Sequence, residues 1–269
     1  MRIVGAVLAA GALAAVLVLG GNGRAGQSHA GCAMHTRPCR VLFVGNSYTY
    51  VNDLPSMFED LAFAGNHSVE AEAVAEGGES LTDHLDSGDV KDALQAAKWN
   101  IVVLQEQSEI PASERPRQTE MYPAARQLLS TIQAAGAQPM FFLTWAHRDG
   151  WPEHGLTSYA SMQSAVDAGY RGIARNLHTA VAPVGDAWAA VLGEEQRAGR
   201  RAGLWVHDGS HPTVMGTYLA ACVFYATIFR ESPIGLPYDD GIPAKEVARL
   251  QAAASQITLG GSAKQVRFR

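Results

Sequence analysis

The sequence predicts an α/β protein with a three-layer α/β/α architecture around a central, mainly parallel sheet. Beyond residue 39, short apolar runs alternate with longer segments that have apolar residues at helical spacing. This alternation is typical of a parallel sheet that helices cover on both faces. The chain has 269 residues, of which 47% are hydrophobic, and this is enough for the substantial core that such a fold needs.

Five segments have the character of strands. The run 101–104 is continuously apolar, as a buried parallel strand is, and 40–44 is similar after its arginine. Segment 69–75 alternates glutamate with small or apolar residues, which predicts a partly exposed strand. Two further apolar segments, 140–143 and 181–184, complete the predicted sheet.

Helices are expected between and after these strands. Asp186 is placed to cap a helix that follows the last strand. Neither an internal repeat nor a low-complexity linker divides the chain, so one domain is predicted. Apolar residues at helical spacing predict the other long helices over 54–64, 119–136, 159–177, 213–230 and 244–257.

The first 30 residues have the features of a secretory signal. A short basic start is followed by the uncharged apolar stretch 3–20, and small residues surround Ala30. We therefore predict a signal peptide over 1–30, export to the cell envelope or beyond it, and a mature single domain over 31–269. The alternative is a retained membrane anchor, because the apolar stretch approaches the length of ~18 residues that a span requires.

Charge and cysteine content narrow the functional classes. The formal net charge is -5 and no basic stripe is present, which argues against nucleic-acid binding. No Cys/His spacing resembles a zinc site, so neither a metal nor another cofactor is implied. In an oxidising compartment Cys32 and Cys39 could close a small loop, whereas Cys222 lies in an apolar helical pattern and is expected to be a buried free thiol.

Polar residues follow the ends of the predicted strands, where the functional groups of an open parallel sheet collect. The first strand ends in Gly-Asn-Ser, which contains Ser47, and the second in Glu-Gly-Gly-Glu-Ser, which contains Gly78. The third ends in Gln-Glu-Gln-Ser, with Gln105 and Gln107. We therefore expect the active groups of the protein at this edge of the sheet.

Ser47, His211 and Asp208 have the chemistry of a serine hydrolase. A serine hydroxyl is a weak nucleophile until a base takes its proton, and histidine is the usual base near neutral pH. Asp208 and His211 are three residues apart in Asp-Gly-Ser-His-Pro, so one tight turn brings the carboxylate to the imidazole that it must orient. The adjacent His207 is the alternative base, but no acid stands three residues before it.

Donors for the oxyanion of such a reaction are available at the same edge. The backbone N–H groups of Ser47 and Gly78 are two candidates, and the side-chain amides of Gln105 and Gln107 are two more. Each also has a plainer interpretation, because the glycine suits a loop hinge and the glutamines could hold loops. Glu106 is interpreted as a solvated loop charge.

Other polar and aromatic residues near these strand ends are left out of the predicted site. His84, His147, His154 and Trp145 could line a cleft, but isolated histidines and aromatics are more often packing residues.

Four stretches, VLFVGNSYT, GGESL, LQEQS and DGSHP, resemble in this order the SGNH (GDSL-type) hydrolase superfamily. The resemblance spans residues 40–230 and implies a flavodoxin-like fold. It implies Ser47 as the nucleophile, His211 as the base and Asp208 as the orienting acid. It also implies Gly78 as the oxyanion donor of the second block.

Two positions depart from the superfamily pattern. Asn46 stands where many members have aspartate, and LQEQS replaces the usual Gly-x-Asn of the third block. A glutamine in this block resembles the sialate-esterase-like branch, in which the amide does the work of the asparagine. Gln107 is preferred over Gln105 as this donor because it lies further beyond the strand.

The resemblance and the predicted export together imply a secreted serine esterase that needs no cofactor. Short acyl groups such as acetyl, carried on carbohydrates, are the expected substrates. A lipolytic esterase or thioesterase is the enzymatic alternative, although no long apolar lid segment is evident. A carbohydrate-binding protein that kept the fold and lost catalysis is the alternative from another class, and the intact set of Ser47, Asp208 and His211 argues against it.

Overall fold

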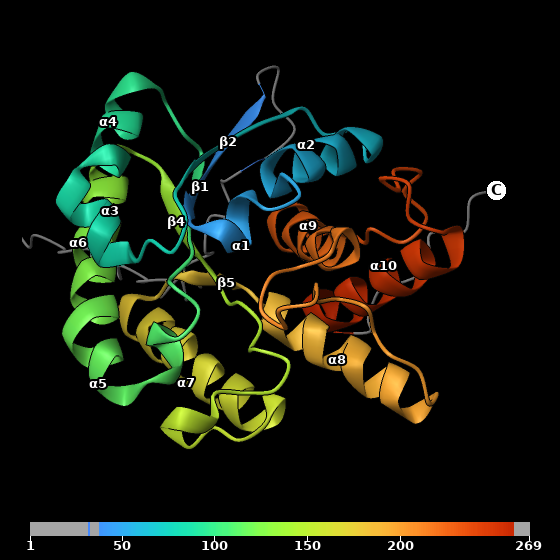
Figure 1. Ribbon diagram of the computed structural model, residues 1–269. Helices are drawn as coiled ribbons and strands as arrows, with labels where there is room; N and C mark the ends of the chain where they lie inside the picture. The colour runs from blue at the N-terminus through green and yellow to red at the C-terminus, as the bar shows by residue number, and fades with distance from the viewer. Residues whose placement is uncertain (1–31, 33–37, 261–269) are drawn as a thin grey trace, which may run out of the picture.

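The centre of the protein is a sheet of five strands, all paired in parallel, in the order β2-β1-β3-β4-β5 (Figure 1). The computed structural model describes Cys32 and residues 38–260. Each predicted strand is found within two residues of its expected ends, so the predicted parallel sheet is confirmed. The strands are β1 Cys39–Gly45, β2 Val69–Ala75, β3 Ile101–Leu104, β4 Gln138–Phe142 and β5 Ala180–Ala182.

Helices cover both faces of this sheet, which confirms the three-layer α/β/α architecture (Figure 1). One layer contains α3 Leu81–Ser87, α4 Asp89–Ala96, α6 Tyr122–Ala134 and α7 Tyr159–Leu177. The other contains α2 Leu54–Ala64, α8 Val184–Arg197, α9 Val214–Phe229 and α10 Ala244–Leu259. The short elements are α1 Ser47–Tyr50, α5 Glu114–Pro116, the 3₁₀ turns Ile110–Ala112 and Pro152–His154, and a π turn over Arg117–Met121.

The apolar run of β1 is continuous because both faces of this strand are buried. Val41 and Phe43 pack into the core beneath α2 and α9, and Phe43 meets Phe224 of α9 edge-on at 5.1 Å between ring centroids. Leu42 and Val44 point into the opposite core, beneath α3 and α6. A central strand of a doubly covered sheet therefore has no solvent face, as its composition predicts.

The predicted capping role of Asp186 is wrong. Strand β5 ends at Ala182, two residues before the predicted end, and α8 begins at Val184 with Pro183 at the N-cap position and no side-chain cap. Asp186 therefore lies inside the first turn, where its carboxylate suits the positive end of the helix dipole and pairs with Arg171 of α7.

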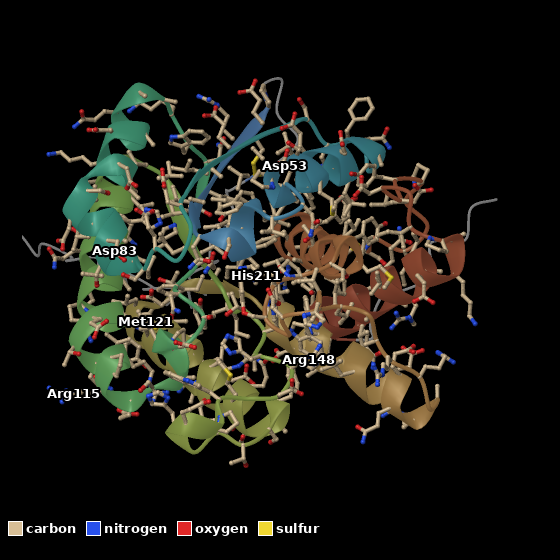
Figure 2. All side chains as sticks on the ribbon, in the orientation of Figure 1. Asp53, Asp83, Arg115, Met121, Arg148 and His211 are labelled. Atoms are coloured by element: carbon tan, nitrogen blue, oxygen red, sulfur yellow. A yellow bond between two sulfur atoms is a disulfide. The ribbon has the colours of Figure 1, made fainter. Side chains whose placement is uncertain are left out.

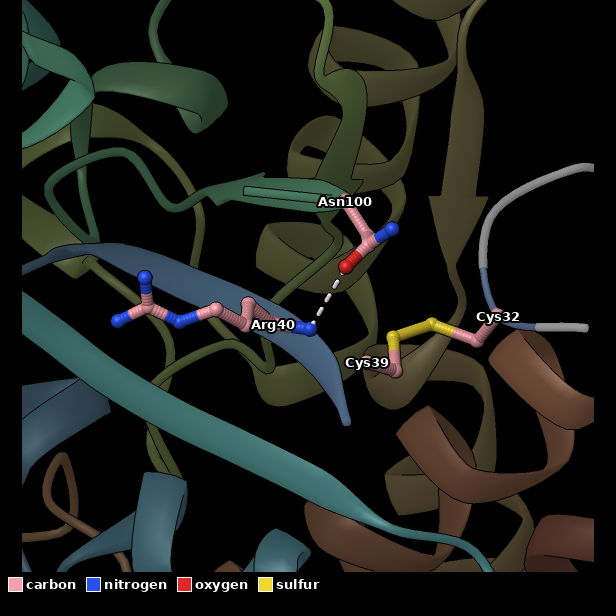
Figure 3. The surroundings of a disulfide bond; sticks show 4 residues. All are labelled: Cys32, Cys39, Arg40 and Asn100. Carbon is pink, nitrogen blue, oxygen red and sulfur yellow. Dashed lines mark hydrogen bonds between the residues drawn. A yellow bond between two sulfur atoms is a disulfide. The ribbon is translucent and has the colours of Figure 1, made fainter. Parts of the chain in front are cut away.

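A disulfide joins Cys32 to Cys39, the first residue of β1 (Figure 3). Next to it, the backbone N–H of Arg40 donates to the side-chain oxygen of Asn100 at 2.8 Å. Cys222 is a buried free thiol, as predicted.

Within residues 38–260 none of the helices combines the length and the apolarity needed to cross a bilayer. The predicted signal peptide, 1–30, lies outside the described residues.

Candidate active site

The candidate site lies at the point where the strand order of the sheet reverses. The chain places β2 on one side of β1 and all later strands on the other, so the connections after β1 and β3 run to opposite faces. The resulting crevice outside the carboxyl ends of these strands is where open α/β sheets bind ligands. Ser47 follows β1 at this point, and Gln107 follows β3.

A tight turn carries Ser47 from the strand into a helix. Asn46 caps the short helix α1, because its side-chain oxygen accepts the N–H of Tyr48 at 3.1 Å, and Ser47 is the first helical residue. Gly45 is required just before this turn. A Cβ atom at Gly45 would lie 2.3 Å from Oε1 of Gln105 and 2.6 Å from Oγ1 of Thr49, closer than van der Waals contact allows.

The structure brings Ser47, His211 and Asp208 together in one chain of hydrogen bonds. Nε2 of His211 lies 2.8 Å from Oγ of Ser47, and Nδ1 of His211 lies 2.7 Å from Oδ2 of Asp208. His211 sits beside α1 near the centre of the molecule (Figure 2). The alternative base, His207, is exposed and makes no hydrogen bond with either Ser47 or Asp208.

The turn from Asp208 to His211 holds the acid in its ionised form. Oδ1 of Asp208 accepts the backbone N–H groups of Ser210 at 2.8 Å and of His211 at 2.9 Å, while Oδ2 faces the imidazole. Partial burial on its own would raise the pKa of Asp208, but these hydrogen bonds and the imidazole outweigh it and hold the pKa below the usual value. The carboxylate is therefore ready to orient the ring and stabilise an imidazolium.

Two aromatic residues hold the middle of this turn. The hydroxyl of Tyr48 lies 2.7 Å from Oγ of Ser210, and Nε1–H of Trp145 donates to the Ser210 carbonyl at 2.9 Å. The rings of Tyr48 and Trp145 stack at 4.5 Å, and Trp145 stacks in turn on Trp188 at 4.1 Å. Trp145 is thus a packing residue, as interpreted, but it also positions the turn that contains His211. The sequence around a single tryptophan does not indicate such a positioning role.

The backbone N–H groups of Ser47 and Gly78 are both free to bind a ligand. Neither donates to an acceptor within the described residues. Gly78 is exposed and has φ +80, a conformation that glycine adopts without strain. Nδ2 of Asn46 donates to the carbonyl of Glu79 at 2.8 Å and so ties the Gly78 loop to the nucleophile turn. An aspartate carboxylate at position 46 could not make this bond, since it has no N–H.

The two glutamines have different surroundings. Gln105 is fully buried: its Oε1 accepts the N–H of Asn46 and the hydroxyl of Thr49, both at 2.9 Å, and its Nε2 donates to Asn46 Oδ1 and the Glu106 carbonyl. Gln107 is half-buried, and its Oε1 accepts two backbone N–H groups of the following loop at 2.8 and 3.2 Å. Its Nε2 has no protein acceptor within residues 38–260, whereas both polar atoms of the Gln105 amide are occupied.

Glu106 is buried, which overturns its interpretation as a solvated loop charge. Its Oε1 accepts the backbone N–H of Leu81 at 3.1 Å and of Gln107 at 2.7 Å, and so joins the start of α3 to the end of the third strand. Its Oε2 is buried without a hydrogen-bond partner. Burial raises the pKa of Glu106 to about 8 against the effect of the two N–H groups, so the carboxyl is protonated at neutral pH.

His147 and Arg148 extend the site beyond β4. Nε2 of His147 lies 3.2 Å from Oγ of Ser108, and burial lowers the pKa of His147, which favours the neutral form of its ring. The backbone N–H of Arg148 donates to the Gly209 carbonyl at 2.7 Å, beside the His211 turn, and Figure 2 shows Arg148 below His211. Both side chains therefore come from a loop that contacts the acid–base turn.

Another cavity, of about 1070 Å³, lies at the opposite end of the sheet. Residues at the amino ends of β4 and β5 and at the end of α7 line it, among them Gln138, Arg175 and His178. Its lining residues do not combine a nucleophile, a base and an acid. The candidate active site is therefore placed at the edge of the sheet where Ser47 lies.

No protein-family model matches the chain, and no curated protein matches its sequence. Solved structures do match. A candidate SGNH hydrolase from Slackia heliotrinireducens is 29% identical with a TM-score of 0.59, and the match covers 71% of this chain and 100% of that one. A DUF4886 family protein from Bacteroides uniformis is 18% identical with a TM-score of 0.65, covering 82% and 95% of the two chains. An acetylxylan esterase from Geobacillus stearothermophilus is 15% identical with a TM-score of 0.54, covering 70% and 93%.

The two glutamines should respond differently to substitution. Gln107→Glu keeps an oxygen for the two loop N–H groups but removes the free amide donor, so we expect kcat for an acetyl ester to fall about 100- to 1000-fold, as for other lost oxyanion donors. Gln105→Ala leaves buried polar groups of Asn46 and Thr49 unpaired, at about 1–3 kcal/mol each in the free energy of unfolding. Steady-state kinetics and urea unfolding of both variants test this, and wild-type kcat in Gln107→Glu would remove Gln107 from the site.

Glu106 should make the stability of the protein depend on pH. The folded protein holds the Glu106 proton up to about pH 8, whereas an unfolded glutamate releases it near 4.5. Between these values the folded state binds more protons than the unfolded state, so the free energy of unfolding falls as pH rises, by at most about 1.4 kcal/mol per pH unit. Glu106→Gln has the shape of the protonated acid and lacks this contribution.

The measurement is urea unfolding of wild type and Glu106→Gln at a series of pH values from about 5 to 9. We expect the variant to gain stability relative to wild type as pH rises through this window, with no further gain above it. Two curves that stay parallel throughout would show that Glu106 is ionised in the folded protein.

Proposed function

We propose that this chain, which belongs to the SGNH hydrolase superfamily, is a serine esterase that uses Ser47 as its nucleophile, His211 as its base and Asp208 as the orienting acid. The observation that carries the proposal is the unbroken hydrogen-bond chain from Ser47 Oγ through His211 to Asp208, at 2.8 and 2.7 Å. The three groups occupy the roles that nucleophilic acyl transfer requires.

The geometry supports a two-step reaction. His211 Nε2 takes the proton of Ser47 as Oγ attacks the ester carbonyl carbon, and the resulting oxyanion is bound by the N–H groups of Ser47 and Gly78 and by the Gln107 amide. The tetrahedral intermediate collapses as the imidazolium returns the proton to the leaving alcohol, which leaves an acyl group on Ser47. Water, deprotonated by His211, then attacks this acyl group and releases the carboxylic acid and the free serine.

Short acyl groups on carbohydrates are the substrates that we propose. Two acetylxylan esterases are among the solved structures with this fold. The side chains of Asp208 and His211 are 47% and 38% exposed, so the reacting groups lie where a bulky sugar can approach them. A fatty acyl chain would instead need a long apolar channel, and the first half-buried side chains after β3 and β4 are polar: Gln107, Ser108 and His147.

We also propose that the protein is exported and that its mature form is one catalytic domain beginning at Gly31. The disulfide between Cys32 and Cys39 supports this, since such bonds persist in oxidising compartments and are rare in the cytosol.

Hydrolysis of p-nitrophenyl acetate by wild type and by Ser47→Ala tests the esterase proposal. We expect turnover by the wild type and a loss on the order of a million-fold in the variant, as in comparable triads. Equal rates in the two proteins would contradict the esterase proposal and favour the alternative of a binding protein with the same fold.

The acyl preference is measured with the same assay on esters from acetyl to long acyl chains. We expect kcat/KM to be highest for acetyl and to fall with chain length. A maximum at long chains would make the protein a lipolytic esterase.

N-terminal sequencing of protein exported by an expressing cell tests the proposed processing. We expect the mature chain to begin at Gly31, because the small residues that end at Ala30 suit signal-peptide cleavage. An exported protein that still begins at Met1 would instead support the membrane anchor.

A further inference from the structure

His84 is next to the Gly78 loop, and its side chain has no exposed surface. It sits on α3, and both of its ring nitrogens meet oxygen atoms. Nε2 lies 2.7 Å from the carbonyl oxygen of Gly45, while Nδ1 lies 3.0 Å from Oδ2 of Asp89 and 3.4 Å from Oε2 of Glu79. The interpretation of His84 as a simple packing residue does not account for these contacts.

The oxygen atoms around the ring decide which nitrogens carry protons. A backbone carbonyl only accepts hydrogen bonds, so Nε2 must donate to Gly45. Ionised carboxylates also only accept, so Nδ1 must donate to Asp89. A ring with a proton on each nitrogen is the form that satisfies all of these contacts, because Nε2 faces a carbonyl and Nδ1 faces the two carboxyl groups of Asp89 and Glu79.

Two of the three groups that the ring of His84 faces belong to the segments that carry the candidate backbone oxyanion donors, and the third, Asp89, begins α4. Gly45 ends β1 two residues before Ser47, and Glu79 directly follows Gly78. The Glu79 main chain is already tied to this turn by the hydrogen bond from Asn46, at 2.8 Å. The ring of His84 also faces the Glu79 side chain, with Nδ1 at 3.4 Å from Oε2, a charge contact without a hydrogen bond. The Gly78 loop is therefore approached at a second point.

We propose that His84 is a positioning residue that clamps the Gly78 loop to the end of β1, and so sets the separation of the Ser47 and Gly78 N–H groups that bind the oxyanion. The inference rests on the proposed esterase function. Oxyanion donors stabilise the transition state only when they are aimed at the position that the oxyanion will occupy. By positioning these donors, His84 would stabilise the transition state and would leave the affinity for the ground-state ester almost unchanged.

The same three side chains could instead hold a metal ion. Glu79, His84 and Asp89 are a group in the described residues whose potential ligand atoms all lie within 4.8 Å of one another. The hydrogen bond from Nε2 to Gly45 fits either arrangement, but a metal would need an unprotonated Nδ1. The experiment must therefore separate an imidazolium clamp from a metal site.

His84→Gln is the main test variant, because its amide can still donate to the Gly45 carbonyl but carries no charge for Glu79 and Asp89. We expect kcat for p-nitrophenyl acetate to fall about 10- to 100-fold, less than the 100- to 1000-fold cost of a whole lost donor. KM should stay within about twofold, and the affinity for a trifluoromethyl ketone, whose adduct carries the oxyanion, should fall in parallel with kcat. His178→Gln is the matched control, since His178 ends α7 at the opposite end of the sheet.

Glu79→Gln serves if His84→Gln does not fold, because the Glu79 side chain is 25% exposed and its loss leaves Asp89 on the ring. The same split between kcat and KM is expected, to a smaller extent. In the wild type, the nitrogen NMR signals of His84 should show a proton on both ring nitrogens.

Three results would overturn the clamp: a folded His84→Gln or Glu79→Gln variant with wild-type kcat, a change confined to KM, or activity that EDTA removes and zinc restores. These failures are distinct from failure of the proposed function. If Ser47→Ala is inactive while His84→Gln turns over like wild type, the esterase proposal stands and only the positioning role falls.

Discussion

The buried exchange of hydrogen bonds between Asn46 and Gln105 is the interaction on which the geometry of the site depends. Asn46 donates its backbone N–H to Gln105 Oε1, and Gln105 returns a bond from Nε2 to Asn46 Oδ1, each at 2.9 Å. Because the residues follow β1 and β3, this pair locks the two strand ends at the switch point of the sheet. Removing either side chain would leave buried polar groups of the other residue without a hydrogen-bond partner. The turn that contains Ser47 and the loop that contains Gln107 therefore form one unit.

The fold could be predicted closely where local signals agree. Strands 69–75 and 101–104 were predicted to the residue, because their apolar patterns have clear ends. The start of α8 was missed because Pro183 and the short β5 leave no side-chain cap to mark it. Helix α3 was also missed, although Ser80 and Asp83 form a capping box, because the helix is short and mostly polar.

The residues of the candidate site also differ in how well the sequence alone predicts them. Asp208 and His211 could be found from spacing alone because one turn joins them, and Ser47 from its place after an apolar strand. The burial of Glu106 and the distinct surroundings of the two glutamines could not be predicted, because all three residues follow the end of β3, where strand periodicity no longer applies. The strand ends there, and the side chains after it are placed by contacts with residues far away in sequence.

The Asp208–His211 turn has a consequence for when the molecule becomes reactive during folding. The acid–base pair spans three residues and can form early, whereas the contact between His211 and Ser47 joins positions 164 residues apart. A contact between positions so far apart in sequence needs the packed sheet and helices that lie between them. The hydrogen bond between Ser47 and His211 therefore depends on the docking of the His211 turn, which precedes α9, against the end of β1, and a chain in which these segments are not yet packed together lacks it.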